Sequence, residues 1–360
     1  MSRYYDWEKT FSYDADVTMV IGARGYGKTF GLRRQFIRDW KRDESRFVEI
    51  VRYKNELSGV SDGYFDRLAE LPENENFLFR TDSRYAFIAE KPENYEEKIR
   101  NGEKIQLVWH TIGYFLAMTD NQRAKKRTFK NVRRIVLDEA IIERSDRYHS
   151  YLANEYATLA NIVDTVSRER ADTKGIRPRV YLLGNACDFG NPYFGAYGVT
   201  SDLKFGYRWF ARKTFLLHYV DAGEYGREKL VGTVAGRMLA GTEAGAIAAG
   251  NEFVGLGTDF VKPKPKHAKF AFGIFFNGSQ FGVWSDYKEG YYHVTGKIPE
   301  NSRSVYYFSN ADARVNYIAA KSTSRLFQTF GEAYYMGLIR YESVDVKIGF
   351  QDVLKCFGIK

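Results

Sequence analysis

Short apolar runs rich in β-branched residues recur along the first 222 residues and alternate with longer polar or amphipathic stretches. This alternation is typical of an α/β domain wound around a mostly parallel sheet. The predicted core strands are residues 17–21, 46–51, 135–139, 180–184 and 214–220. Residues 154–170 have apolar positions at helical spacing, which predicts a helix with one buried face. Between these elements, an inserted β-hairpin region is expected at residues 77–80, 84–89 and 105–118.

The pattern changes after residue 222. Residues 232–250 are dominated by Gly and Ala, which fits either a mobile helical connector or a tightly packed pair of small-residue helices. Residues 262–269 repeat Lys and Pro and are expected to be extended, so a domain boundary is placed there.

Alternating apolar strands follow at 269–284 and 291–294, joined by an Asn277-Gly278 turn, and an aromatic helix is expected at about 322–340. We therefore expect a second, α+β domain with an antiparallel meander. The predicted parts are residues 1–222, 223–261 and 262–360.

A glycine-rich segment directly follows the first predicted strand and fits the phosphate-binding pattern GxxxxGK[ST]. Its residues are Gly22, Ala23, Arg24, Gly25, Tyr26, Gly27, Lys28 and Thr29. Glycines let backbone N–H groups turn toward the α- and β-phosphates, the lysine reaches the β- and γ-phosphates, and the threonine hydroxyl ligates Mg²⁺. A helix beginning near Lys28 adds its positive dipole end. The segment predicts a nucleoside triphosphate, ATP, bound with Mg²⁺.

Two carboxylates end the strand predicted at 135–139. Asp138 is expected to hold Mg²⁺ through water, and Glu139 to polarise an attacking water molecule, which indicates hydrolysis. The alternative for Glu139 is a solvated strand end. The long interval between Lys28 and Asp138 leaves room for an extra strand between the two motif strands.

Three further polar residues are candidates for the same site. Asn185 follows the strand at 180–184 and is expected to sense the γ-phosphate, although a turn-forming Asn is an equal alternative. Arg168, with Arg170 in reserve, is expected to act on a neighbouring subunit's site, and the alternative is a cap on its helix. Arg24 could act within its own subunit.

Residues 123–134 contain seven basic residues and no acid. A solvated loop and a contact with an anion, either DNA phosphate or a neighbour's nucleotide, are both open. Lys125 and Lys126 are the nucleic-acid candidates in this segment. Arg52 and Lys54, after the second predicted strand, pose the same question.

The second domain lacks the carboxylates that a two-metal nuclease needs. Its first predicted strand has no acid, and Asp286, Asp312 and Asp345 lie apart at turn-like positions. Basic residues interleaved with aromatic ones fit contacts to a nucleic-acid backbone and base stacking better, with tyrosines of a small core as the alternative.

Charge and cysteine content narrow the class of protein. The net charge is +9, and residues 261–360 hold 14 Lys and Arg against 8 Asp and Glu, which favours a polyanionic partner. Two cysteines are too few for a disulfide framework. No stretch approaches the roughly 18 apolar residues that span a bilayer. We expect a soluble, intracellular protein that does not bind a membrane.

Ordered segments along nearly the whole chain carry a family resemblance. They include Val20–Lys28, Val51–Leu57, Leu137–Glu139, Asp164–Arg170, Asn185-Ala186, Asn191–Phe194, Gly241–Glu243, Asn251–Phe253 and Phe281–Trp284. On these residues the chain resembles the DNA-packaging (encapsidation) ATPases of phi29-type small podoviruses, which are terminase-like motors.

The resemblance implies a P-loop ATPase domain of the ASCE class, a small linker subdomain and a vestigial RNase H-like domain. It further implies a homopentameric ring at the portal vertex of an empty capsid in the host cytoplasm, which moves double-stranded DNA inward. By the same resemblance, Lys28, Asp138 and Glu139 are the Walker residues, Arg168 is a finger acting in trans, and Asn185 is the sensor.

Lys54 and Lys125 fall where the family carries lysines linked to DNA gripping and to subunit contact. Some relatives dock through a structural RNA, and the sequence leaves this open here. Two other functions also stay open: an ATP-switched nucleic-acid-binding protein without translocation, and a terminase with an active nuclease.

Overall fold

The computed structural model describes residues 5–142, 151–152, 154–168, 177–221, 223–239, 241–242, 251, 253, 260–321 and 324–357. The chain forms two compact units. The first consists of residues 1–187 and 204–252, and the second of residues 188–203 and 253–360. Among the described residues no helix is long and apolar enough to cross a membrane.

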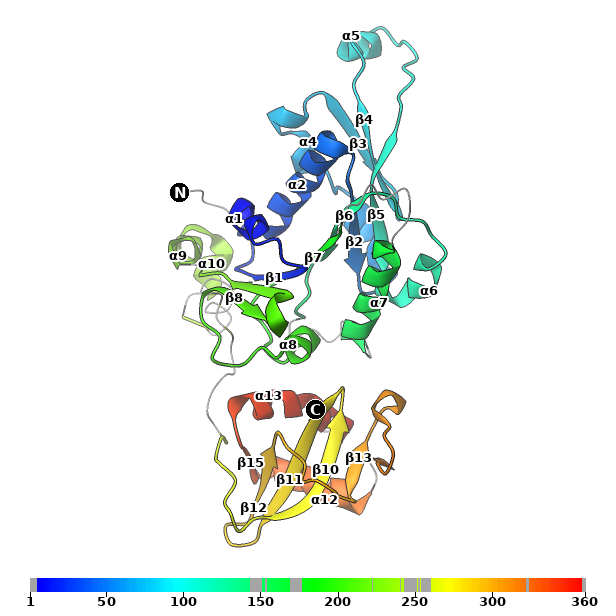
Figure 1. Ribbon diagram of the computed structural model, residues 1–360. Coiled ribbons are helices and arrows are strands. Elements are labelled where there is room, and N and C mark those ends of the chain that lie inside the picture. The colour runs from blue at the N-terminus through cyan, green and yellow to red at the C-terminus, as the bar shows by residue number, and fades with distance from the viewer. Residues whose placement is uncertain are drawn as a thin grey trace. The chain divides into compact units, whose positions relative to one another are not determined.

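The first unit is built on a nine-stranded sheet within the described residues, in the order β3-β4-β5-β2-β6-β7-β1-β9-β8 (Figure 1). Its strands are β1 (Val17–Ile21), β2 (Arg46–Val51), β3 (Phe77–Thr81), β4 (Tyr85–Glu90), β5 (His110–Ala117), β6 (Val132–Leu137), β7 (Arg179–Gly184), β8 (Gly206–Phe210) and β9 (Phe215–Tyr219). The six strands from β5 to β9 in this order are parallel, and β3, β4 and β8 add antiparallel edges.

The expected mostly parallel sheet is confirmed. Strand β7 pairs with both β1 and β6, so an extra strand does separate the strand before the phosphate loop from the strand before Asp138. The carboxyl ends of these parallel strands lie at one sheet edge, where the candidate residues are collected.

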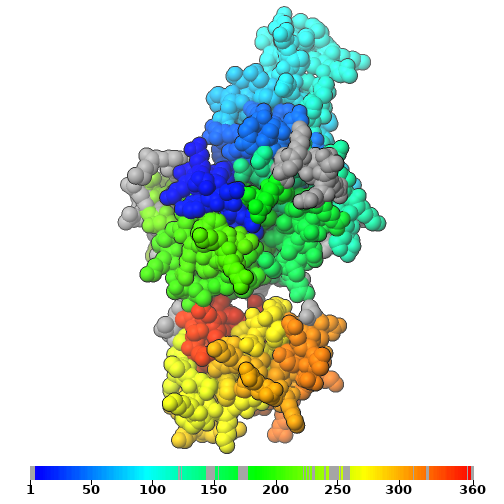
Figure 2. Space-filling model, viewed as in Figure 1, coloured from blue at the N-terminus to red at the C-terminus, as the bar shows by residue number. Residues whose placement is uncertain are grey.

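The helices of the first unit are mostly short. They are α1 (Trp7–Ser12), α2 (Lys28–Asp43), α3 (Glu56–Ser61), α4 (Asp66–Ala69), α5 (Tyr95–Arg100), α6 (Asn121–Ala124), α7 (Glu155–Ser167), α9 (Gly223–Gly232) and α10 (Val234–Leu239), with 3₁₀ turns at Pro72–Asn74, Met118–Asp120 and Ala211–Lys213. Helix α2 packs Leu32, Phe36 and Ile37 against apolar residues of the sheet. This buried face holds the amino terminus of α2 beside the end of β1. In the space-filling view, the region of β3, β4 and α5 projects beyond the rest of the first unit (Figure 2).

The second unit contains a six-stranded sheet within the described residues, in the order β14-β13-β10-β11-β12-β15. Its elements are α8 (Pro192–Tyr197), β10 (Lys269–Phe276), β11 (Ser279–Asp286), β12 (Tyr291–Thr295), β13 (Val305–Tyr307), a 3₁₀ turn (Asn310–Asp312), β14 (Ile318–Ala319), α12 (Arg325–Tyr335), β15 (Ile339–Tyr341) and α13 (Val344–Cys356). Strand β11 is antiparallel to its neighbours, whereas β13, β14 and β15 pair in parallel. This mixed sheet agrees with an RNase H-like order of strands, and phenylalanines of β10, α12 and α13 fill its core.

Several boundaries differ from the sequence prediction. The aromatic helix expected at 322–340 ends at Tyr335, because Gly337 adopts a left-handed conformation (φ 70°) and the chain then forms β15. The meander is confirmed in β10, β11 and β12, with positive φ at Asn277 and Gly278 in the predicted turn. Three parallel strands that the apolar pattern missed extend it.

Candidate nucleotide site

The phosphate-binding segment forms a loop between β1 and α2. Gly25 and Gly27 have φ values of 83° and 79°, a conformation that L side chains rarely adopt. The Gly22 N–H donates a 3.1 Å hydrogen bond to the Gly184 carbonyl on the neighbouring strand β7, and the Tyr26 N–H donates to Ala23 O at 3.3 Å. The backbone therefore favours glycine at Gly27, a position of the motif, and at Gly25, one of its variable positions.

Lys28 begins α2 and is 7% exposed. Its ammonium group donates to Gly22 O at 2.6 Å, to Ala23 O at 3.1 Å and to the Asn185 side-chain oxygen at 3.2 Å. The charge is thus held inside the loop, beside the residue predicted as the sensor. The structure brings Lys28 and Asn185 together, as the sequence led us to expect, although their roles stay predictions.

Thr29 and Asp138 meet at the mouth of the loop. The Thr29 hydroxyl donates to the Asp138 carboxylate at 2.9 Å. The Glu139 N–H donates to the other Asp138 oxygen at 2.9 Å, and Glu139 has a φ of 50°, so the backbone turns sharply after β6. The hydroxyl of Thr29 and the carboxylate of Asp138 are oxygen ligands of the kind that Mg²⁺ prefers. The adjacent lysine and the backbone N–H groups of the glycine-rich loop suit the phosphates of a triphosphate.

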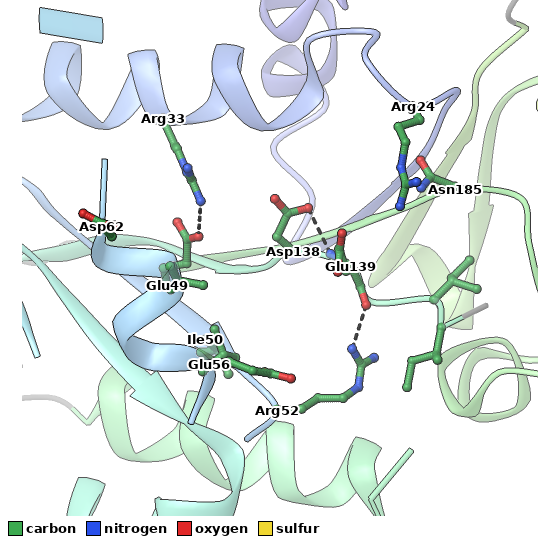
Figure 3. Close-up of a pocket in the computed structure, with 15 residues that line it drawn as sticks. Arg24, Arg33, Glu49, Ile50, Arg52, Glu56, Asp62, Asp138, Glu139 and Asn185 are labelled. Carbon is green, nitrogen blue, oxygen red and sulfur yellow. Dashed lines mark hydrogen bonds and ion pairs between the residues drawn. The ribbon is translucent and has the colours of Figure 1, made fainter. Parts of the chain in front are cut away.

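The exposed side chain of Glu139 lies with Asp138, Asn185 and Arg24 on the wall of a cavity of about 520 Å³ (Figure 3). Arg24 is itself exposed. The cavity walls therefore carry carboxylate, amide and guanidinium groups that could act on a bound phosphate or on water.

Arg52 is placed differently from the nucleic-acid contact that the sequence suggested. It is 6% exposed, and its guanidinium donates to the fully buried carboxylate of Glu155 at 3.0–3.1 Å. It also donates to the backbone carbonyl of Glu139 at 2.7 Å (Figure 3) and to that of Ala140 at 2.6 Å. A buried, paired guanidinium that holds the turn after Asp138 is unsuited to DNA, so the earlier assignment is corrected: Arg52 positions the candidate catalytic loop.

A second ion pair, between a partly buried arginine and a buried glutamate that the sequence did not identify, lines the same cavity. Arg33 of α2 donates to Glu49 of β2 at 2.6 Å (Figure 3), and the Tyr64 hydroxyl donates to the other Glu49 oxygen at 2.5 Å. Burial raises the pKa of the Glu49 carboxyl, and the Arg33 guanidinium opposes part of that rise. Glu49, the one charged residue of the apolar run 47–51, was the sequence signal that could have revealed this ion pair.

Arg168 ends helix α7 as its C-cap residue, and its side chain is about half exposed. Its guanidinium lies 4.0 Å from the carboxylate of Asp164 one turn earlier, at the distance limit of an ion pair. The side chain therefore keeps an exposed guanidinium at a helix end, which leaves the predicted role in trans untested. Arg170 lies outside the described residues.

The basic segment 123–134 is divided between structural and exposed side chains. Arg134 is buried between Asp39 (2.5 Å) and the Tyr181 hydroxyl (2.7 Å), and Arg133 pairs with Asp43 at 2.7 Å. Lys125 and Lys126 are exposed. Lys54, on the turn after β2, is exposed too. These three lysines stay candidates for contacts with a polyanion.

The three aspartates of the second unit that were considered for a nuclease site, Asp286, Asp312 and Asp345, accept hydrogen bonds within the fold. The buried Asp286 carboxylate accepts from His267 at 2.9 Å and from the N–H of Lys288. Asp312 accepts from the N–H groups of Asn277 and Gly278, and Asp345 from that of Ser201. Among the described residues no group of three or more His, Cys, Asp or Glu is arranged to hold a metal ion.

Comparisons with known proteins agree with this geometry. Residues 1–355 match the model of the family described as podovirus DNA encapsidation protein (Gp16). The DNA packaging protein of Bacillus phage phi29 is 27% identical over 344 residues, covering 95% of this chain and 94% of that one. The DNA packaging protein of Bacillus phage B103 is 27% identical over 334 residues, covering 92% and 94%. In the solved phi29 viral genome packaging motor assembly, a chain 26% identical superposes with a TM-score of 0.70 and covers 99% of this chain and 100% of that one.

Proposed function

Because the chain belongs to the podovirus DNA encapsidation protein (Gp16) family, we propose that it is the ATP-driven motor that packages double-stranded DNA into a preformed viral capsid. The observation that carries the proposal is the 2.9 Å hydrogen bond from Thr29 to Asp138, which places a phosphate-loop hydroxyl against a strand-end carboxylate. The family match covers residues 1–355 and so includes this site. We infer that the motor binds and hydrolyses its nucleotide here.

In this proposal, Lys28 and the N–H groups of the phosphate loop bind the triphosphate, and Thr29 and Asp138 hold Mg²⁺. When bound, Mg²⁺ neutralises developing charge on the phosphate oxygens. Glu139 accepts a proton from the attacking water, and Asn185 orients that water toward the γ-phosphate. Arg52 fixes the Glu139 backbone through the 2.7 Å bond to its carbonyl, which keeps the carboxylate near the cavity.

We further propose that the chain assembles into a homo-oligomeric ring, with five subunits as the resemblance implies. Arg168 from one subunit then completes the neighbour's site by stabilising transition-state charge, and its half-exposed position supports this role. Arg24, in the loop, acts within its own subunit.

The ring's other partners are also part of the proposal. Exposed Lys54, Lys125 and Lys126 contact DNA phosphates, which carry no sequence information and suit a motor that moves any sequence. We place the ring at the portal vertex of the procapsid in the host cytoplasm, and leave open whether a structural RNA joins it. We propose residues 1–222 as the ATPase domain, 223–261 as the linker and 262–360 as a vestigial RNase H-like domain; the compact units differ from these bounds, since residues 188–203 and 253–261 belong to the second unit.

The proposed motor activity is tested by ATP turnover with and without long duplex DNA. We expect DNA to stimulate turnover and salt to weaken the stimulation, since contacts to phosphate release counterions. Turnover that ignores DNA would favour an ATP-controlled binding protein without translocation. Cleavage of plasmid DNA with Mg²⁺ or Mn²⁺ would instead favour a nuclease.

The action of Arg168 in trans is tested by mixing inactive subunits. Glu139→Gln subunits keep Arg168, and Arg168→Ala subunits keep Glu139, so mixed rings contain some complete sites. We expect mixed rings to recover ATPase activity that neither variant has alone. Arg177→Ala, which removes another exposed arginine, is the control and should stay active unmixed. Mixed rings as inactive as the separate variants would refute action in trans.

A further inference from the structure

Asn251 is a fully buried residue of the first unit, at 0% exposure. Its side-chain amide donates to Ile21 O at 3.0 Å and to Val220 O at 2.8 Å, and its side-chain oxygen accepts from the Ala186 N–H at 3.3 Å. Its own carbonyl accepts from the Tyr219 hydroxyl at 2.7 Å. One amide therefore joins three different segments, and both of its N–H donors and its oxygen are used.

The three segments belong to the candidate nucleotide site. Ile21 is the last residue of β1 before the phosphate loop, Ala186 directly follows the proposed sensor Asn185, and Val220 follows β9. Lys28 contacts Gly22 O and the Asn185 side chain, which are each one residue from a partner of Asn251. If Lys28 exchanged these partners for a phosphate, Gly22 or Asn185 could shift. Such a shift would reach Asn251 through the Ile21–Gly22 peptide unit or the Asn185–Ala186 peptide unit.

The same residues lie where the chain passes between the two units. The chain leaves the first unit after residue 187, directly after the segment held by the Ala186 N–H, and leaves it again after residue 252, directly after Asn251. The Asn251–Ala186 hydrogen bond therefore links both of these exits within the first unit.

Helix α9 provides a second contact between the phosphate loop and the segment that precedes Asn251. The Tyr225 hydroxyl donates to Gly25 O at 2.7 Å, and the Tyr225 and Tyr26 rings lie 5.0 Å apart. The loop is thus held at its apex by α9 and at its base by Asn251. Both contacts come from the part of the first unit that follows β9.

We propose that Asn251 is a positioning residue that couples nucleotide binding at the phosphate loop to the two chain segments that lead into the second unit. The inference rests on the proposed function, because it presumes that ATP binds at Gly22–Thr29. A buried amide with all its polar atoms paired holds a single geometry, since any alternative would leave carbonyls or N–H groups unpaired. Asn251 can therefore pass on a displacement rather than absorb it.

The test is hydrogen–deuterium exchange of the full chain, with and without Mg²⁺ and a non-hydrolysable ATP analogue. Nucleotide affinity is measured in parallel with a fluorescent analogue. In the wild type, we expect the analogue to change exchange in peptides covering residues 185–203 and 251–270. Asn251→Gly tolerates the φ of 53° at this position and removes the amide. At a concentration of analogue that saturates this variant, we expect it to lose most of the exchange change in both peptides.

Two further variants distinguish coupling from general damage. Tyr219→Phe keeps the aromatic ring and removes the hydroxyl that donates to the Asn251 carbonyl, and should give a smaller loss of the same exchange change. Asn74→Ala removes another buried side-chain amide, which donates to Leu68 O at 2.7 Å and has no contact with the phosphate loop among the described hydrogen bonds. This variant should leave the exchange change intact.

The outcomes separate this inference from the proposed function. A wild type that does not bind the analogue would contradict the proposed function itself. A wild type that binds it without any exchange change in these peptides would overturn the inference alone. The inference would also be overturned if the analogue changed exchange in these peptides as much in Asn251→Gly and Tyr219→Phe as in the wild type. The same holds if Asn74→Ala lost as much of this exchange change as Asn251→Gly.

Discussion

Arg52 and Glu155, 103 positions apart in the sequence, form an ion pair in which the side chains are 7% and 0% exposed. Glu155 also accepts from the Leu152 N–H at 3.0 Å, and Arg52 reaches the carbonyls of Glu139 and Ala140. The pair thus ties the amino terminus of α7 to the turn that presents Glu139. It serves both the stability of the unit and the geometry of the site.

Removing the carboxylate from this pair should be costly. We expect Glu155→Ala to lower the free energy of unfolding by about 3–5 kcal/mol, because it leaves a buried guanidinium without its counter-charge. Denaturant titration measures this change. Glu96→Ala is the control, since the Lys91–Glu96 pair is exposed and should contribute less than about 1 kcal/mol. Equal effects of the two substitutions would show that Arg52 is not held by charge.

The contact between Thr29 and Asp138 predicts a requirement for an oxygen at both positions. We expect Asp138→Asn to reduce ATP turnover by at least about 100-fold, because a neutral amide stabilises Mg²⁺ poorly. Thr29→Ala should also be impaired, whereas Thr29→Ser keeps the hydroxyl and should retain most activity. Steady-state turnover as a function of Mg²⁺ concentration tests this. Full activity in Asp138→Asn would exclude the proposed metal site.

The residues of the phosphate loop and Asp138 could be predicted because their chemistry is encoded locally. Gly25 and Gly27 need left-handed conformations and Lys28 starts a helix, and all of this fits into eight consecutive positions. The sheet was predictable for a similar reason, since each core strand is a short apolar run. The long interval between Lys28 and Asp138 did not identify the strand inserted between β1 and β6, because that strand is β7 (Arg179–Gly184), which follows Asp138 in the chain.

Residues whose roles depend on distant partners could not be predicted in this way. Arg52 and Lys54 both follow strand β2 closely in the sequence. Only the fold shows that Arg52 pairs with Glu155, whereas Lys54 is exposed to solvent. Asn251 lies in a segment without any apolar pattern, and its three partners come from β1, β9 and the segment after β7. Similarly, Arg133 and Arg134 belong to a basic run in sequence but to ion pairs with α2 in the structure.

The close approach of Gly31 to Trp7 gives a prediction about α1. A Cβ at Gly31 would lie 2.6 Å from the Trp7 ring, whose N–H donates to Lys28 O at 2.9 Å. We expect Gly31→Ala to destabilise the protein by about 1–3 kcal/mol through overpacking, even though alanine favours a helix. Thermal unfolding measures the effect.

Gly195→Ala is the matched control for this substitution, because a Cβ there meets nothing within 4 Å in helix α8. It should be neutral or slightly stabilising. If Gly31→Ala behaved in the same way, the Trp7 ring could not be packed against α2 as described.

His218 predicts how stability depends on pH. Burial, assisted by the charge of Lys9, lowers the pKa of His218 to about 4, and its Nδ1 lies 2.7 Å from the Tyr5 hydroxyl. Between pH 6.5 and 4 the unfolded chain takes up a proton at this position that the folded protein excludes, so stability present above pH 6.5 is lost as the pH falls. The slope from this group cannot exceed about 1.4 kcal/mol per pH unit, because one imidazole takes up at most one proton. Denaturant titrations at pH 4.5, 5.5 and 7 should show a shallower loss in His218→Gln than in the wild type, whereas a substitution of the exposed His110 should not change it. Equal slopes in the wild type and His218→Gln would mean that His218 takes up its proton equally in the folded and unfolded states, and that burial beside Tyr5 does not exclude the charge.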